Sequence, residues 1–238
     1  MTLFSIRGIP VRLHWSFVWL GGGLLLFDAL SHGLGGAAEA LVLGVMVFGS
    51  VLLHELGHAL TARRFGIGTR DITLYPFGGI AAITAEPRQP RVELAVAVAG
   101  PLVNVALAGL GLWAWKLGLP GAGIFATINA GMALFNLLPA YPMDGGRVLR
   151  AFWSLHQDRV RAPLRAIKVG RGFGWAMIAA GLLWSPSLVL VGGFLLIATA
   201  SERRRTLLMA HATPPRPTRW VHAAPQARQL HHWDHPAV

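Results

Sequence analysis

The stretch Val51-Leu52-Leu53-His54-Glu55-Leu56-Gly57-His58-Ala59-Leu60 places two histidines and a glutamate in an otherwise apolar sequence. It belongs to an apolar run from about Ala37 to Phe65, which is long enough to cross a bilayer as a helix. On such a helix His54 and His58 lie one turn apart on the same face, about 6 Å along the axis. Ionisable residues are costly in lipid, so their presence here predicts a functional site.

Two imidazoles with this spacing can chelate one zinc ion, and Glu55 beside them can take a proton from a water on the metal. The alternative is a chance sequence match, in which the histidines only form hydrogen bonds to neighbouring helices. The chain contains no cysteine, so a thiolate zinc site and a disulfide framework are both excluded. Any metal must be held by His, Asp or Glu.

Composition predicts an integral membrane protein. Of the 238 residues, 54% are hydrophobic and only 13% are charged, and the mean hydropathy is +0.52. Apolar runs recur along most of the chain, which predicts an all-α polytopic membrane protein with about six transmembrane helices. The expected spans are residues 14–30, 37–65, 94–115, 121–138, 169–184 and 187–200.

The expected organisation is a six-span membrane domain, residues 1–205, followed by a disordered cytosolic tail, residues 206–238. Between spans two and three, residues 72–75 and 80–84 alternate like short strands on either side of Pro76-Phe77-Gly78-Gly79. This pattern predicts a small β-hairpin associated with the membrane surface. An ordinary cytosolic loop is the alternative.

The net charge of +11 is explained by membrane topology. With six spans and both termini in the cytosol, all 21 lysines and arginines except Lys116 fall on the cytosolic side. The asymmetry therefore predicts a protein embedded in the lipid bilayer with both termini cytoplasmic. It removes the reason to expect a nucleic-acid partner.

Asp144 is the best candidate for a third metal ligand, since catalytic zinc usually has three protein ligands. It follows Pro139 and Pro142 at the inner end of the fourth span, at about the depth expected for His58. The prolines interrupt the helix there, which a bilayer tolerates only where the backbone is buried in protein or lines a wet cavity. A helix-capping role before two glycines is the alternative.

Two asparagines in the predicted spans are polar groups at membrane depth. Asn136 lies about two turns before Asp144, where an amide could stabilise an oxyanion or form a hydrogen bond between helices; the sequence favours neither role. Asn104, in the third span, is predicted to make a packing hydrogen bond between helices.

With both halves of the site identified, the chain resembles the site-2 proteases, a family of intramembrane zinc metalloproteases. The resemblance covers roughly residues 5–150. It is carried by His54-Glu55-Leu56-Gly57-His58, Asn136-Leu137-Leu138-Pro139, Met143-Asp144-Gly145-Gly146-Arg147, Gly8-Ile9-Pro10 with His14-Trp15, Pro76-Phe77-Gly78-Gly79, and Ala99-Gly100-Pro101-Leu102-x-Asn104. The family usually has leucine at the position of Met143. No PDZ or CBS domain is evident, so we expect a compact bacterial or archaeal type of member.

The resemblance implies one zinc held by His54, His58 and Asp144, with Glu55 as general base and acid. It also implies regulated intramembrane proteolysis of a single-span membrane-protein substrate, in a bacterial inner membrane. The substrate helix must unwind, and the hairpin with Gly78 and Gly79 is expected to hold the extended segment by strand addition. The rival function is a non-enzymatic transporter or metal-binding membrane protein, which has no special need for Glu55. The sequence indicates no oligomeric state.

Overall fold

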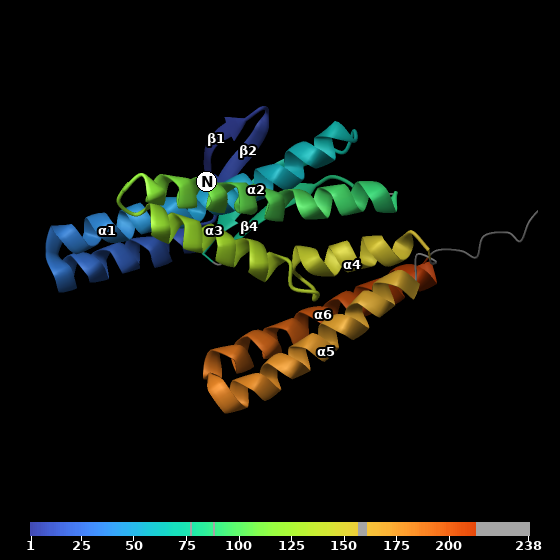
Figure 1. The fold of residues 1–238 in the computed structure, drawn as a ribbon. Coiled ribbons are helices and arrows are strands. Elements are labelled where there is room, and N and C mark those ends of the chain that lie inside the picture. Colours follow the sequence, from blue (N-terminus) through green and yellow to red (C-terminus); the bar gives the residue numbers. More distant parts are fainter. Residues whose placement is uncertain (77, 88, 157–160, 213–238) are drawn as a thin grey trace, which may run out of the picture.

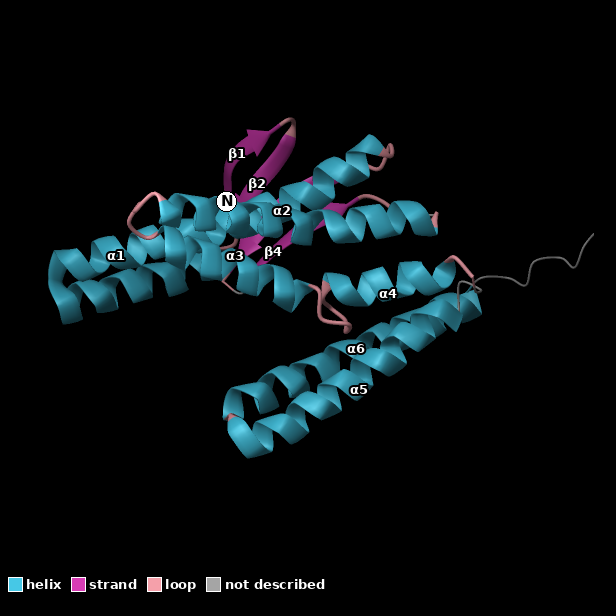
Figure 2. Cartoon of the chain, in the orientation of Figure 1, coloured by secondary structure: helices cyan, strands magenta, loops and turns pink. Residues whose placement is uncertain are grey.

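The computed structural model describes residues 1–76, 78–87, 89–156 and 161–212. Helices run side by side, and a four-stranded sheet packs against one of them (Figures 1 and 2). The elements in chain order are β1 (Thr2–Ile6), β2 (Ile9–Leu13), α1 (Trp15–Arg64), β3 (Thr69–Tyr75), β4 (Gly78–Ile83), α2 (Pro90–Lys116), α3 (Ala122–Asn136), α4 (Asp144–Ser154), α5 (Arg161–Trp184) and α6 (Pro186–Ala212).

Four helices in the described part of the chain are long and apolar enough to cross a membrane: α1, α2, α5, and α6 as far as Met209. Helix α3 is also apolar but has only 15 residues. The 50 residues of α1 are interrupted at Gly33, whose φ of 69° and ψ of −166° are not helical. Figure 1 shows α1 doubling back into two arms, so the predicted turn between spans one and two is present. A positive φ favours glycine at that position.

The predicted hairpin exists, but it is half of a larger sheet. Strands β3 and β4 pair antiparallel, β3 pairs in parallel with β2, and β2 pairs antiparallel with β1. Residues 2–13, which precede the first expected span, form strands β1 and β2, so the expected hairpin is enlarged to a four-stranded sheet beside the helices. Phe77 of the predicted turn lies outside the described residues.

The sheet packs against the second arm of α1. Val11 and Ile72 are fully buried in the same apolar cluster as Leu56 and Ala59 of α1. Because the strand order is β1-β2-β3-β4, β4 is an edge strand. The packing brings β4 beside the part of α1 that carries the two histidines.

The C-terminal part of the chain differs from its predicted boundaries. The fifth expected span, 169–184, is the C-terminal part of α5, which begins at Arg161. Helix α6 continues to Ala212, past residue 200, at which the sixth span was predicted to end. From residue 213 onward the predicted tail lies outside the described residues.

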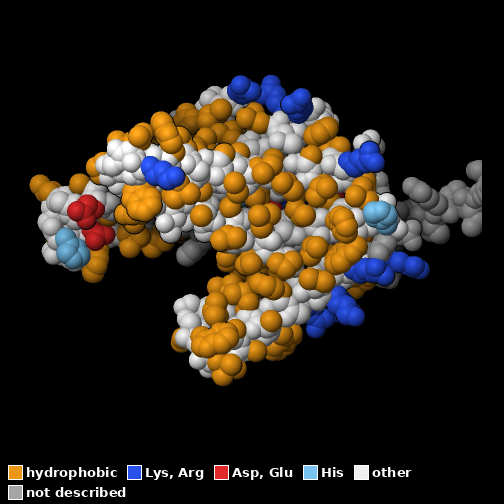
Figure 3. All heavy atoms as spheres, viewed as in Figure 1, with side chains coloured by type: hydrophobic (Ala, Val, Ile, Leu, Met, Phe, Trp, Pro, Cys, Tyr) orange, Lys and Arg blue, Asp and Glu red, His pale blue; other side chains and the backbone are white. Residues whose placement is uncertain are grey.

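Apolar side chains cover most of the face drawn in Figure 3. Many are fully open to the surroundings, such as Leu34 at 88% and Trp184 at 79% exposed. Basic side chains gather at the end where α4, α5 and α6 meet and over the β1–β2 hairpin. An apolar surface of this extent is expected for a protein surrounded by lipid.

Candidate metal centre

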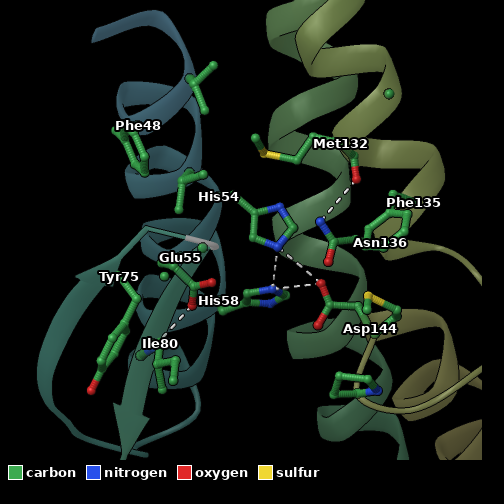
Figure 4. Close-up of a pocket in the computed structure, with 18 of the residues that line it drawn as sticks. Phe48, His54, Glu55, His58, Tyr75, Ile80, Met132, Phe135, Asn136 and Asp144 are labelled. Atoms are coloured by element: carbon green, nitrogen blue, oxygen red, sulfur yellow. Dashed lines mark hydrogen bonds and ion pairs between the residues drawn. The ribbon is translucent and has the colours of Figure 1, made fainter. Parts of the chain in front are cut away.

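Helix α1 and the start of α4 bring three candidate ligands together. The Nε2 atoms of His54 and His58 lie 3.1 and 3.0 Å from the same oxygen of Asp144, Oδ2, and 3.1 Å from each other (Figure 4). All three side chains are buried. Within the described ranges they form the one group of His, Asp and Glu residues that could hold a metal ion.

The hydrogen bond at Nδ1 of each imidazole indicates whether Nε2 of the neutral ring carries a proton or a lone pair. His58 Nδ1 lies 2.7 Å from the carbonyl oxygen of Val96, which can only accept, so Nδ1 carries the proton of a neutral ring. His54 Nδ1 lies 2.5 Å from Asn104 Oδ1, which also can only accept a hydrogen bond. The Asn104 side chain has this orientation because its amide nitrogen donates to Asn129. Both Nε2 atoms therefore direct lone pairs at the Asp144 carboxylate. When both rings are neutral, these three electron-rich atoms have no proton between them, an arrangement that a bound cation would stabilise.

The donor set and the spacing fit zinc. Ligands about 2.0–2.2 Å from a tetrahedral zinc lie roughly 3.3–3.6 Å from one another, close to the observed separations. Gly100 of α2 lies directly against the centre. A Cβ atom at this position would meet the ring of His58 and would lie 2.7 Å from His54 Nε2. The missing side chain thus leaves the space that an ion and its ligands need.

A buried hydrogen-bond chain supports His54 from behind. The amide nitrogen of Asn104 donates to Asn129 Oδ1 over 2.9 Å, and the amide nitrogen of Asn129 donates to Ser50 Oγ over 3.0 Å. These three side chains are at most 1% exposed. The chain joins α1, α2 and α3 and fixes the orientation of the His54 ring.

Asn104 is the functional residue that the sequence analysis undervalued. Its amide makes the predicted hydrogen bond between helices, but its oxygen also contacts a metal ligand. The spacing of Gly100 and Asn104 was an available signal, because residues four apart share a helix face. That face of α2 is the one turned toward His54.

The edge strand β4 holds the side chain of Glu55. The backbone nitrogen of Ala81 donates to Glu55 Oε2 over 3.1 Å. At Gly79 the strand passes so close that an added Cβ would lie 2.7 Å from Glu55 Cγ. Glycine is therefore needed for the contact. Glu55 is fixed by the sheet on one side and follows His54 directly on α1.

A cavity of about 1180 Å³ opens beside the centre. It is lined by all the predicted site residues: His54, Glu55, His58, Gly78, Gly79, Asn136 and Asp144. The amide nitrogen of Asn136 donates to the carbonyl oxygen of Met132 in its own helix over 3.0 Å. This bond lies within α3, so it is neither of the two roles considered for Asn136, and the residue lines the cavity.

Comparison with known proteins gives consistent matches. The chain matches Peptidase family M50 over residues 42–123 and 120–180. It is 38% identical over 216 residues to the putative zinc metalloprotease Rip3 of Mycobacterium tuberculosis, covering 81% of this chain and 54% of that protein. A putative zinc metalloprotease of Synechocystis is 39% identical over 205 residues, covering 80% of this chain and 54% of that protein.

A solved structure, the site-2 protease from Methanocaldococcus jannaschii, is similar with a TM-score of 0.62 and 32% identity. The match covers 86% of this chain and 95% of that one. The chain spans about half the length of the first curated relatives that it matches. The family match extends over more than half of the chain and includes the histidines, Glu55 and Asp144. The curated relatives that the chain matches are mostly named as zinc metalloproteases or putative zinc metalloproteases, and the chain belongs to peptidase family M50.

Proposed function

We propose that the protein is an intramembrane zinc metalloprotease. It hydrolyses a peptide bond in or near a transmembrane helix of a single-span membrane protein, as a step of regulated intramembrane proteolysis. The proposal rests on one observation: the buried side chains of His54, His58 and Asp144 meet at a cavity that Glu55 also lines.

The chemistry is divided among the residues of the centre. His54, His58 and Asp144 hold the zinc, which when bound supplies Lewis-acid activation of water and of the scissile carbonyl. Glu55 takes a proton from the attacking water and delivers it to the leaving nitrogen. The hydrogen bond from Ala81 engages Oε2, so Oε1 is the oxygen free for proton transfer. Asn136 contributes a polar group at the cavity wall.

The substrate is held as an extended strand at the edge of β4. The Ala81 N–H points away from β3, because it donates to Glu55. In a strand the backbone groups alternate, so the N–H and carbonyl of Gly79 also point away from β3. Gly78 and Gly79 line the cavity without side chains that would block a pairing strand.

Six crossings follow if both arms of α1, together with α2, α3, α5 and α6, each traverse the bilayer. Helix α3 is about 22 Å long, so the irregular residues 137–143 complete its crossing. Both termini are then cytoplasmic, residues 1–205 form one membrane domain, and the tail from 206 is cytosolic. The bacterial inner membrane is the compartment that this topology fits.

The variant Glu55→Gln tests whether Glu55 serves proteolysis or only metal binding. It keeps the shape of the side chain but removes the base, so cleavage of a transmembrane substrate in liposomes falls by about 10²–10⁴-fold. Zinc content and thermal stability of the same preparation stay near the wild-type values. The matched control is Glu39→Gln, an exposed glutamate of α1, which keeps full activity. Full activity in Glu55→Gln would contradict the role of Glu55 as the base, whereas a zinc-loaded wild type that cleaves no transmembrane substrate would favour the transporter or metal-binding alternative.

A further inference from the structure

Arg147 of α4 lies at the wall of the active-site cavity, one helical turn after Asp144. About a quarter of its side chain is exposed, at 26%. Among the described residues that line the cavity, it is the one arginine or lysine. The roles assigned above to His54, Glu55, His58, Asn136 and Asp144 leave this cation without a function.

The first turn of α4 is clamped in place. A Cβ atom at Gly145 would run into the carbonyl oxygens of Leu137 and Leu138, and one at Gly146 would lie 2.8 Å from the backbone of Ala140. These contacts fix the helix against the irregular segment before it. Asp144 and Arg147 are therefore presented to the cavity from a rigid support.

The ion-pair partner of Arg147, Asp144, occupies little of the hydrogen-bonding capacity of the guanidinium. Its NH1 atom lies 3.9 Å from Asp144 Oδ1, an ion pair but too long for a hydrogen bond. A guanidinium has five N–H donors in a planar fork. Most of them remain able to bind an acceptor that enters the cavity.

Arg150, one turn further along α4, shows what a structural arginine looks like in the same helix. Its Nε donates to Glu93 Oε1 over 2.5 Å, and its NH1 lies 3.8 Å from Glu202. Two carboxylates therefore balance it. Arg147 lines the cavity, and among the described residues its one ion-pair partner is Asp144, whose carboxylate also contacts two histidines.

Peptide hydrolysis creates a negative charge in this cavity. The water oxygen bonds to the carbonyl carbon, the C–N bond breaks with its electron pair going to nitrogen, and the nitrogen takes the proton held by Glu55. The acid that remains gives its own proton to water and becomes a carboxylate. A guanidinium fork binds a carboxylate through two parallel hydrogen bonds.

We propose that Arg147 contacts the substrate, binding the carbonyl oxygen as it becomes negative and then the new carboxylate of the N-terminal product. This inference rests on the proposed protease function. It predicts that the enzyme binds peptides ending in a free carboxylate better than the same peptides ending in a carboxamide.

The test compares a short acetylated peptide of leucine and alanine, as free acid and as carboxamide, for binding to the zinc-loaded protein in detergent. The wild type should bind the acid at least 10-fold more tightly. In Arg147→Gln the ratio should fall to about 3-fold or less, with zinc content unchanged, and Arg147→Lys should lie between. The control is Arg165→Gln, an exposed arginine of α5, which keeps the wild-type ratio.

Three results would overturn the assignment. One is an unchanged acid preference in Arg147→Gln. Another is a loss of zinc that fully accounts for the lost preference, since Arg147 would then act only through Asp144. The third is a wild type that binds acid and carboxamide equally. A wild type that shows the Arg147-dependent preference but cleaves no transmembrane substrate would contradict the proposed function and leave the carboxylate site standing.

Discussion

The helices α1–α3 and the hairpin α5–α6 are packed by the same device, glycine against a neighbouring backbone. In the first group a Cβ at Gly57 would lie 2.9 Å from the carbonyl oxygen of Ala99. In the second, a Cβ at Gly192 would lie 2.6 Å from the carbonyl oxygen of Gly174. Close backbone approach therefore does not distinguish the two groups, and helices in lipid commonly associate in this way.

Buried polar side chains do distinguish them. In α1–α3 the chain of Ser50, Asn129, Asn104 and His54 passes from helix to helix. In α6 the fully buried hydroxyl of Thr199 donates to the carbonyl oxygen of Leu195 in its own helix. One group is joined by directional bonds that fix side-chain orientation, whereas apolar contact dominates the other.

The attachment of α5–α6 to the rest of the molecule is also less extensive. Leu195 packs on Ala140 and Met143, and Glu202 pairs with Arg150 of α4. Figure 1 shows the hairpin lying apart from α1 and α3 toward its turn. Phe194 is its one contribution to the described cavity lining. Directional bonding is therefore concentrated where a metal must be held.

The largest effect is expected from Gly100→Ala. The new methyl group would occupy the space beside His58 Nε2 and His54 Nε2. Zinc binding and proteolysis should therefore fall by on the order of 100-fold or more, as measured by metal analysis and substrate cleavage. Gly109→Ala in the same helix meets no atom within 4 Å and should change neither. A Gly100→Ala protein with full zinc would show that the centre can shift to make room.

The second largest effect is expected from Asn104→Ala, which tests the contrast between the buried polar groups of α1–α3 and those of α5–α6. Asn104→Ala removes the acceptor that orients His54, so zinc affinity or activity should fall by about 10- to 100-fold. Thr199→Val removes a buried hydroxyl from α6 and should leave zinc affinity unchanged. Competition with a zinc chelator measures both. Equal losses of zinc affinity in the two variants would contradict the conclusion that only the buried polar groups of α1–α3 support the metal ligands.

The smallest effect on the metal centre is expected from Gly192→Ala. Its methyl group would lie 2.6 Å from the Gly174 carbonyl oxygen and 2.8 Å from Ile178 Cγ1, forcing α5 and α6 apart. Overpacking of this kind costs about 1–3 kcal/mol, so the melting temperature in detergent should fall. Zinc stoichiometry should stay at the wild-type value. Gly193→Ala has no atom within 4 Å and is the control; zinc loss in Gly192→Ala would show that the two groups are coupled.

The metal centre could be predicted largely from the sequence because its constraints are local. His54, Glu55 and His58 lie within two helical turns, and Asp144 was identified by its depth and by the prolines before it. For Asn104 the sequence shows only that it shares a helix face with Gly100, and not what that face contacts. Composition does not show which buried amide faces a metal ligand, since that depends on the register between α1 and α2.

The parts of the fold that were missed depend on contacts between distant segments. Strand β2 pairs in parallel with β3, which lies far along the chain, and the local sequence of residues 9–13 does not predict that pairing. Basic residues mark the expected end of a membrane crossing, but they do not end a helix. In α6, Arg205 pairs with Glu86 over 3.0 Å, and the helix continues to Ala212.

The reversal at Gly33 bears on how the chain is inserted during biogenesis. The two arms of α1 are joined through one non-helical residue, and Asp28 and His32 beside it lie 3.4 Å apart. No long hydrophilic loop has to be translocated between the arms. We expect them to leave the insertion machinery as a helical hairpin. The apolar first arm then carries the second arm, with its two histidines and its glutamate, into the bilayer before the rest of the catalytic centre has been synthesised.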